Sequence, residues 1–261
     1  MVTIAVCNQK GGVGKTSIAT NLIGGFDYHF PEKKKLAIDL DPQGHSSYIL
    51  YRDPNDIDYE KTAYQLFQKK PYTNGDIIHR TRNTNIDMLP SNILLFGIQQ
   101  GTNQLRNNFQ RVRDYLNIMS NAYDIAVIDT PPDLGIFVVN GLIAADYVII
   151  PTDLEQLSVR GITDLWKTIK NVKPKNKNLK ILGVLPNKFN KRIKEQKQTM
   201  SELKDLLKDL LLEDLAIGTN AALSRAIAKG NTIFEYDKKA RSYRQFKELA
   251  EWIAEKCDIH E

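Results

Sequence analysis

The chain has 261 residues, of which 42% are hydrophobic and 26% are charged, a composition ordinary for a globular protein with a sizeable core. Its two cysteines, Cys7 and Cys257, fit no metal-binding spacing. Cys7 lies in the apolar run VTIAVC, where we expect it to be a small buried hydrophobic residue, which favours a reducing, cytoplasmic compartment. No apolar run reaches the roughly 20 residues that span a bilayer, and the strand-like start leads us to expect neither a signal peptide nor an N-terminal accessory domain.

The net charge of +5 is unevenly distributed along the chain. Residues 1–159 carry 14 Lys and Arg against 17 Asp and Glu, whereas residues 160–261 carry 22 against 14. Within the second part, residues 167–197 contain 11 basic residues and a single acidic one, Glu195. This pattern favours a polyanionic partner for the C-terminal half, although a solvated lysine-rich face would give the same composition.

Six short apolar runs indicate strands. They cover Val2–Cys7, Leu36–Leu40, Ile86–Leu89, Ile125–Ile128, Val148–Ile150 and Ile181–Leu185. Several are apolar throughout instead of alternating, as expected of parallel strands that are covered on both faces. Helical stretches separate them, which predicts βαβ crossovers and a mostly parallel, twisted sheet with helices on both faces. We see no internal repeat and no low-complexity linker, and we therefore expect one α/β domain over residues 1–261.

The helical stretches are indicated by the spacing of their apolar residues. We expect helices over Thr16–Gly25, Gly161–Val172 and Ser201–Leu212, and a last helix whose apolar stripe runs from Phe246 to Cys257. The polar region between positions 52 and 85 is rich in Asp and Asn. We expect it to be a surface excursion that contains a short helix near Thr62–Phe67.

The stretch VTIAVCNQKGGVGKTSIATNLI reads as a strand, a glycine loop and a helix. Glycines let successive backbone N–H groups point at phosphate oxygens, and the positive end of the following helix adds to the attraction. Lys15 is expected to reach the β- and γ-phosphates of a bound nucleotide, and the Thr16 hydroxyl to ligate Mg²⁺. The predicted nucleotide-binding residues of this loop are Lys10, Gly11, Gly12, Val13, Gly14, Lys15, Thr16 and Ser17.

The loop departs from the usual phosphate-binding pattern, which would place a glycine where this chain has Gln9. What stands instead is K-G-G-x-G-K-T, with a second lysine, Lys10. In this the chain resembles the ParA/MinD family of deviant Walker-box ATPases, which have a P-loop NTPase fold of the SIMIBI type. The resemblance extends over nearly the whole chain.

The resemblance implies that Lys10 reaches across a homodimer interface to the ATP of the partner. Two facing phosphate loops bring strong negative charge together, and a lysine from each side offsets the repulsion only when nucleotide is present. Dimerisation would then depend on ATP. A solvent-facing lysine beside the loop is the plainer alternative.

Two aspartates close the second predicted strand in LAIDLDPQGHSS. By the same resemblance, Asp39 supports the Mg²⁺ site, Asp41 orients and polarises the attacking water, and residues 42–44 form a switch. Paired aspartates at the end of a strand can also be turn residues without a catalytic role. The catalytic residues implied by the resemblance are Lys10, Lys15 and Asp41, whereas His45 is expected to be a surface histidine.

The stretch YDIAVIDTPPDLG reads as an apolar strand that ends in Asp129. This is the Walker B position, whose carboxylate holds Mg²⁺ through water, so that Thr16, Asp39 and Asp129 form the predicted metal set. Two prolines stiffen the loop that follows, which suits a second switch. Asn187, after the last predicted strand, resembles the adenine-contacting position of related ATPases.

Two basic clusters in the C-terminal half suggest what the ATP switch acts on. The predicted DNA-binding residues are Lys188, Lys191, Arg192, Lys194 and Lys197 after a strand, and Lys238, Lys239, Arg241 and Arg244 in IFEYDKKARSYRQF. Contacts of this kind with backbone phosphates carry no sequence information. The resemblance implies a partitioning ATPase of the ParA type, whose ATP-bound dimer binds non-specific DNA and whose hydrolysis is stimulated by a ParB-type adaptor.

One departure bears on the DNA-binding residues. Relatives often carry arginines in the segment that here reads IGTNAALSRA, where this chain has Thr219 and Ala222. Arg225 is the candidate replacement. The departure weakens the assignment of single DNA-contacting residues but not that of the region.

Related ATPases have other roles, of which one stays open for this sequence and three fit it less well. Positioning a large protein cargo on the nucleoid is an alternative to DNA partitioning. A membrane-positioning role like that of MinD needs a basic amphipathic tail, whereas the tail FKELAEWIAEKCDIHE is acidic. Reductases on this fold need paired cysteines, and the tyrosine-kinase relatives need a tyrosine cluster in the tail. We therefore expect a cytoplasmic, nucleoid-associated ATPase with slow basal turnover, with ATP and Mg²⁺ as cofactors and no membrane partner.

Overall fold

The computed structural model describes residues 1–51, 58, 60–68, 77–100, 109–155 and 158–260. In these residues the chain forms a seven-stranded sheet with the order β3-β4-β2-β5-β1-β6-β7. The strands are β1 (Val2–Val6), β2 (Lys35–Asp39), β3 (His79–Arg80), β4 (Ile86–Leu89), β5 (Ile125–Asp129), β6 (Tyr147–Thr152) and β7 (Lys180–Pro186). Neighbouring strands are parallel except that β3 pairs with β4 in the antiparallel sense. The predicted α/β fold with a mostly parallel sheet is confirmed.

The predicted strands match β1, β2 and β4–β7 to within one or two residues at each end, because these strands are apolar and buried on both faces. Strand β3 was not predicted, since two polar residues carry no strand pattern. A lysine can open the apolar strand β2 because its charge is paired: Nζ of Lys35 lies 2.7 Å from Oδ1 of Asp27 and donates to O of Phe30.

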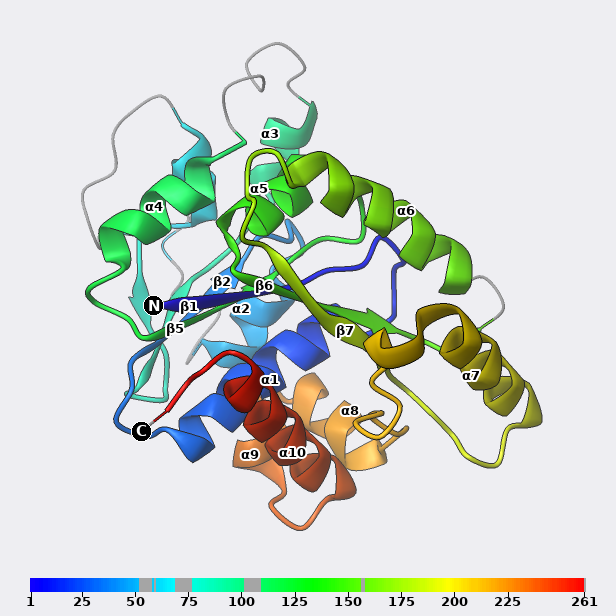
Figure 1. Ribbon diagram of the computed structural model, residues 1–261. Coiled ribbons are helices and arrows are strands. Elements are labelled where there is room, and N and C mark those ends of the chain that lie inside the picture. The colour runs from blue at the N-terminus through cyan, green and yellow to red at the C-terminus, as the bar shows by residue number, and fades with distance from the viewer. Residues whose placement is uncertain (52–57, 59, 69–76, 101–108, 156–157, 261) are drawn as a thin grey trace.

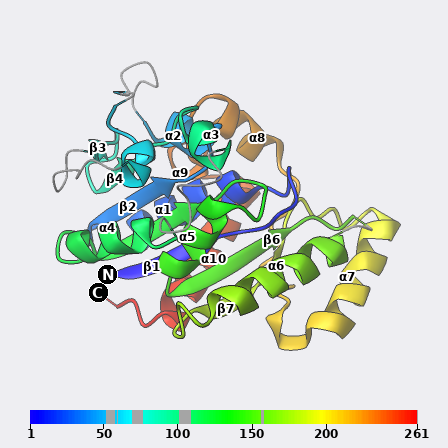
Figure 2. The same ribbon diagram turned by 90° about the horizontal axis from the view of Figure 1, so that it is seen from above.

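Two layers of helices enclose the sheet (Figure 1). One layer contains α1 (Lys15–His29), α2 (His45–Leu50), α8 (Ala221–Ala228), α9 (Ile233–Tyr236) and α10 (Arg241–Lys256). The other contains α3 (Leu95–Gln100), α4 (Arg111–Met119), α5 (Ile136–Ala144), α6 (Ser158–Val172) and α7 (Lys194–Leu207), together with the 3-10 helix at Ala63–Phe67. Each layer buries its own apolar cluster against one face of the sheet. Helices α6 and α7 lie side by side near the β7 edge (Figure 2).

Helix α7 differs from the prediction of a helix over Ser201–Leu212. It starts seven residues earlier, at Lys194, and ends at Leu207, where Lys208 adopts a positive φ of 49°. A short 3-10 turn, Lys208–Leu210, follows, and Leu211 then forms a bridge with Val184 of β7. The apolar spacing continued past Leu207 because Leu211 is buried against a strand, and periodicity does not distinguish that burial from another helical turn.

The parallel register brings the carboxyl ends of the three central strands together. Val6 of β1 lies opposite Asp129 of β5, and Asp129 in turn lies opposite Asp39 of β2. The loop from β1 to α1 therefore runs beside these two aspartates. The strand order changes direction beside β1, between β5 and β6, and ligands of open α/β sheets bind at such a switch point.

Helices α1 and α10 approach each other closely because a glycine stands where they meet. A Cβ atom on Gly25 would lie 2.6 Å from Cβ of Ala250 and 3.1 Å from O of Phe246. The apolar stripe of α10, which includes Leu249 and Ile253, is fully buried in this layer. The stripe near the C-terminus is thus part of the core. Within the described residues, none of the helices combines the length and the apolar character needed to cross a membrane.

We expect Gly25→Ala to lower the free energy of unfolding by about 1–3 kcal/mol, because the added methyl group must push α10 away from α1. Gly97→Ala in α3 is the matched control: among the described residues a Cβ there meets no atom within 4 Å, and alanine favours a helix over glycine by about 1 kcal/mol. Urea unfolding measures both changes. An unchanged unfolding midpoint for Gly25→Ala would contradict the close packing of the two helices.

Candidate nucleotide-binding site

The loop between β1 and α1 turns tightly through two glycines. Gly12 and Gly14 have φ angles of 77° and 93°, in the left-handed region that glycine adopts without strain. Space is also restricted at Gly14, where a Cβ atom would collide with Nδ2 of Asn187. Helix α1 begins directly afterwards, at Lys15, so the N–H groups of the loop and of the first helical turn converge. The loop has the shape of the phosphate cradle that the sequence predicts.

Side chains fix the carbonyl groups of this loop. Nζ of Lys15 donates to O of Lys10 at 3.0 Å, and Nδ2 of Asn187 donates to O of Val13 at 2.8 Å. In a trans peptide the C=O of one residue and the N–H of the next point in opposite directions. A side chain that holds the carbonyl on one face of the loop therefore turns the N–H of the following residue to the other face. Burial lowers the pKa of Lys15, with Asp129 and other neighbours acting in the opposite direction. A bound phosphate would favour the charged form of this lysine.

The predicted metal-binding residues meet at the ends of neighbouring strands. Asp39 and Asp129 are both fully buried. Oδ2 of Asp129 accepts hydrogen bonds from Oγ1 of Thr16 at 2.7 Å and from Oγ of Ser46 at 2.6 Å. Oδ2 of Asp39 accepts from N and Oγ of Ser47, at 2.9 and 2.8 Å. The two carboxylates are therefore bound to the first turns of both α1 and α2.

These carboxylates fit a divalent cation. Burial, and then the charge of the neighbouring carboxylate, raises the pKa of Asp39 to about 8; burial likewise raises the pKa of Asp129 to about 6. Oδ1 of Asp129 is buried and has no hydrogen-bond partner within the described part of the chain. A carboxylate oxygen without a donor, a second buried carboxylate and the Thr16 hydroxyl together form a hard-oxygen donor set of the kind that Mg²⁺ takes.

Asp41 is buried two positions further along. Its N–H donates to Oδ1 of Asp39 at 3.0 Å, and its own Oδ1 accepts from N of Gln43 at 2.9 Å. Oγ of Ser91 donates to its backbone O at 2.6 Å. These bonds fix the turn that leads into α2, and the charge of Asp41 acts on Lys15. Its catalytic role stays a prediction.

The side chain of Lys10 is bound by carboxylates of its own chain. Its Nζ lies 2.8 Å from Oδ1 of Asp153 and 2.6 Å from Oε2 of Glu155, just after β6. Partial burial acts to lower the pKa of Lys10, but the hydrogen bonds to these two carboxylates outweigh it and raise the pKa. Gln9 next to it bonds Asp164 of α6 at 3.1 Å. The lysine that would reach a partner is thus held by an acidic pair of its own subunit.

Some residues of the site were not predicted. Ser46 and Ser47 lie in the GHSS sequence of the second motif, but serines in a turn gave no reason to place them on the carboxylates. Asn8 connects the start of the loop to β6, since its Nδ2 donates to O of Pro151 at 2.7 Å and its Oδ1 accepts from N of Lys10. Asp153 lies 143 positions from Lys10 in sequence, and only the sheet order brings the two together. His45 is exposed, as expected.

The predicted DNA-binding residues gather around the starts of α7 and α10. All of them are exposed: Lys188, Lys191, Arg192, Lys194, Lys197, Lys238, Lys239, Arg241 and Arg244. Two of them also form hydrogen bonds within the chain. Lys188 donates to O of Gly12 at 2.7 Å, and Nη2 of Arg241 donates to O of Thr219 at 2.9 Å.

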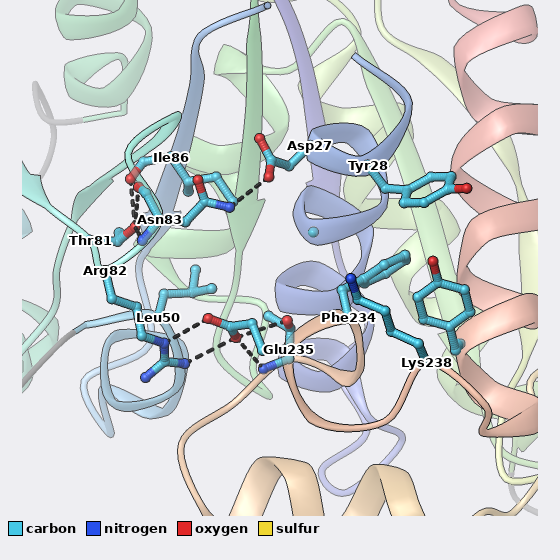
Figure 3. Close-up of a pocket in the computed structure, with 13 residues that line it drawn as sticks. Asp27, Tyr28, Leu50, Thr81, Arg82, Asn83, Ile86, Phe234, Glu235 and Lys238 are labelled. Carbon is cyan, nitrogen blue, oxygen red and sulfur yellow. Dashed lines mark hydrogen bonds and ion pairs between the residues drawn. The ribbon is translucent and has the colours of Figure 1, made fainter. Parts of the chain in front are cut away.

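A cavity of about 200 Å³ lies away from the phosphate loop, between α1, α9 and the turn before β4 (Figure 3). Several of its polar groups bond to one another. Arg82 binds Glu235 of α9 at 2.7 Å and donates to O of Ile49 at the end of α2, and Asn83 donates to Asp27 at 2.6 Å. We therefore interpret these residues as a structural link between α2 and α9.

A family model described as an AAA domain matches residues 1–181. The sheet order, the phosphate cradle and the paired buried carboxylates agree with this match. Together they define the chain as a P-loop ATPase.

Similar sequences show to which family of P-loop ATPases the chain belongs. The sporulation initiation inhibitor protein Soj of Bacillus subtilis is 32% identical over 252 residues, which cover 96% of this chain and 97% of Soj. The chromosome partitioning protein ParA of Myxococcus xanthus is 32% identical over 245 residues, covering 93% of this chain and 84% of that protein. The chain belongs to the ParA family, as the K-G-G-x-G-K-T loop implies.

Solved structures agree with this fold. A Borrelia burgdorferi protein assigned to plasmid partition, bound to AMPPNP, superposes with a TM-score of 0.82 at 26% identity, covering 98% of this chain and 99% of that one. Cobyrinic acid a,c-diamide synthase from Mycobacterium smegmatis, with a bound ATP analogue and magnesium, superposes with a TM-score of 0.70 at 29% identity, covering 80% and 83%.

The raised pKa values predict a pH effect on the ligand-free protein. An aspartate in an unfolded chain has a pKa of about 3.9, so the protonated carboxyls stabilise the folded protein fully below about pH 4, and this contribution is lost as the pH rises through about 8. Asp39→Asn removes the carboxyl with the higher pKa. We expect the ligand-free variant to lose less thermal stability than the parent between pH 5 and pH 8, measured by thermal unfolding.

Asp214→Asn, which removes an exposed carboxylate, is the control and should follow the parent profile. A parent-like profile for Asp39→Asn would mean that the carboxyl pair does not titrate in this range.

Proposed function

We propose that the protein is a DNA-partitioning ATPase that forms an ATP-dependent homodimer and binds non-specific DNA in that state. The observation that carries this proposal is that Lys10, in the phosphate loop, is held by two carboxylates that follow β6. A lysine in this place cannot serve the phosphates of its own chain while it is held by Asp153 and Glu155. A second subunit gives it a phosphate to bind.

We infer that ATP and Mg²⁺ are the cofactors. The phosphate cradle and Lys15 would bind the triphosphate, and Thr16, Asp39 and Asp129 would hold Mg²⁺. When bound, Mg²⁺ neutralises the charge that develops on the phosphates. Asp41, fixed in the turn before α2, would orient the attacking water, and Asn187 would contact the adenine. The ligands of the Borrelia burgdorferi and Mycobacterium smegmatis structures support this assignment.

Dimerisation follows from charge. Two triphosphates that face each other repel, and a lysine ammonium from the opposite subunit offsets the repulsion through a charge-assisted hydrogen bond. Lys10 would leave two carboxylates to make this contact. The exchange becomes favourable only when a partner's phosphates replace the acidic pair, so nucleotide occupancy and pairing are linked.

DNA binding would use the exposed lysines and arginines at the starts of α7 and α10. A dimer presents this surface twice, and two linked surfaces bind one DNA more tightly than a single surface does. ATP would therefore raise the DNA affinity by promoting dimerisation, without changing the DNA contacts of each subunit. The protein would then reside on the nucleoid, and a ParB-type adaptor on the cargo DNA would stimulate hydrolysis and release it. The name of the ParA relative from Myxococcus xanthus supports partitioning as the process.

We expect Lys10→Ala to bind ATP as a monomer, because the cradle of each chain is complete without Lys10. Light scattering with ATP on the hydrolysis-deficient Asp41→Ala background measures the dimer. Lys34→Ala, which removes an exposed lysine just before β2 at the opposite end of the sheet, is the control and should dimerise like the parent. Dimers of normal affinity in Lys10→Ala would remove this role of the lysine.

Charge reversal at Lys191, Arg192 and Lys194 should weaken DNA binding. The logarithm of the DNA affinity falls with the logarithm of salt concentration in proportion to the number of phosphates that the protein neutralises. The slope should therefore flatten by about one for each phosphate that the variant no longer binds. DNA titrations at several salt concentrations, with ATP and with ADP, measure the effect. A slope equal to that of the parent would place the DNA surface elsewhere.

A further inference from the structure

Lys188, the first lysine of the predicted DNA-binding cluster, contacts the phosphate loop. Its Nζ donates to O of Gly12 at 2.7 Å. The preceding residue, Asn187, donates to O of Val13 at 2.8 Å. Two consecutive residues at the end of β7 therefore hold two consecutive carbonyls of the loop. Each carbonyl shares a peptide with the N–H of the next residue, which points the opposite way. The two bonds therefore orient the N–H groups of Val13 and Gly14.

The backbone of Lys188 is held in a conformation that favours this contact. Its φ is 56°, in the left-handed region that lysine adopts only at an energetic cost. Oγ1 of Thr219 donates to O of Lys188 at 2.9 Å. The following residue, Phe189, pairs with the same segment, because its N donates to O of Ile217 and its O accepts from N of Thr219. Such a conformation persists where the surroundings fix it.

Helix α10 fixes that segment in turn. Arg241, the first residue of the helix, donates to O of Thr219 at 2.9 Å, and Nε2 of Gln245 donates to O of Ala216 at 2.7 Å. A Cβ atom on Gly218 would collide with the guanidinium of Arg241. The start of α10, residues 216–219, Lys188 and the phosphate loop thus form one hydrogen-bonded unit.

We propose that Lys188 is a positioning residue for the phosphate loop and not a DNA contact. The fixed backbone directs the ammonium to the carbonyl of Gly12, and the charge-assisted hydrogen bond keeps the N–H of Val13 turned to the phosphate position before nucleotide binds. A preformed cradle binds more tightly because less ordering is required on binding. The inference deepens the proposed function and depends on ATP binding at this loop.

The test compares Lys188→Met with the parent. The variant keeps the aliphatic stem and removes the donor. We expect its Kd for ATP, measured by calorimetry, to rise about tenfold, which corresponds to about 1.4 kcal/mol. Its thermal midpoint without nucleotide should stay within about 2 °C of the parent, because Lys188 is exposed. If the role of Lys188 were merely structural, the substitution would lower this midpoint instead. Lys188→Arg keeps a donor and should recover most of the affinity.

Lys34→Met controls for the loss of a positive charge and should bind ATP like the parent. A second measurement concerns DNA. At saturating ATP, Lys188→Met should keep the salt slope of the parent, whereas Lys191→Met should flatten it by about one. Either an unchanged Kd for ATP or a salt slope reduced by about one in Lys188→Met would overturn the proposal. If the parent itself binds no DNA, the proposed function fails, and the ATP measurement still decides the role of Lys188.

Discussion

Two buried carboxylates at the ends of neighbouring strands organise the whole site. The β2–β5 register places Asp39 opposite Asp129, and burial makes the charge of each costly. The hydroxyls of Thr16, Ser46 and Ser47 offset part of that cost by donating to them. These donors lie in the first turns of α1 and α2, so the same carboxylates hold both the phosphate-loop helix and the helix after the second motif. The hydroxyls of Thr16 and Ser46 occupy Oδ2 of Asp129 and leave its Oδ1 for a cation.

Most of the fold and the chemistry of the cradle could be predicted from the sequence. Strands buried on both faces are continuously apolar, and a run of glycines and a lysine between a strand and a helix is typical of a phosphate-binding loop. That Asp39 and Asp129 lie together could also be predicted, because residues at the ends of parallel strands meet at one edge; their role as metal ligands stays a prediction. Long-range contacts could not. The bonds of Lys10 to Asp153 and of Lys188 to Gly12 depend on the strand order, which no local pattern reveals.

The two lysines of the loop differ in where their ammonium groups can lie. Lys15 begins α1, is buried, and donates back to the loop at O of Lys10, so its charge faces the phosphate position. Lys10 stands before the turn and is bound by carboxylates after β6. One lysine is thus available to the nucleotide of its own chain and the other is not. In the proposed dimer, pairing would have to release Lys10 from Asp153 and Glu155, and this would set an energetic threshold against dimers without nucleotide.

The basic clusters lie where they oppose local helix stability. Helix α7 has Lys194 and Lys197 near its start with Glu195 as the acidic residue of the first turn, and α10 starts with Arg241 and has no acidic residue in its first turn. Cations at a helix N-terminus work against the helix dipole, by about 0.3–1 kcal/mol each when exposed. A bound polyanion reverses the sign, because the side chains and the helix N-termini then attract the same phosphates. This arrangement supports the proposed polyanion surface over a solvated lysine-rich face, which gains nothing from cations at the N-terminal ends of two helices.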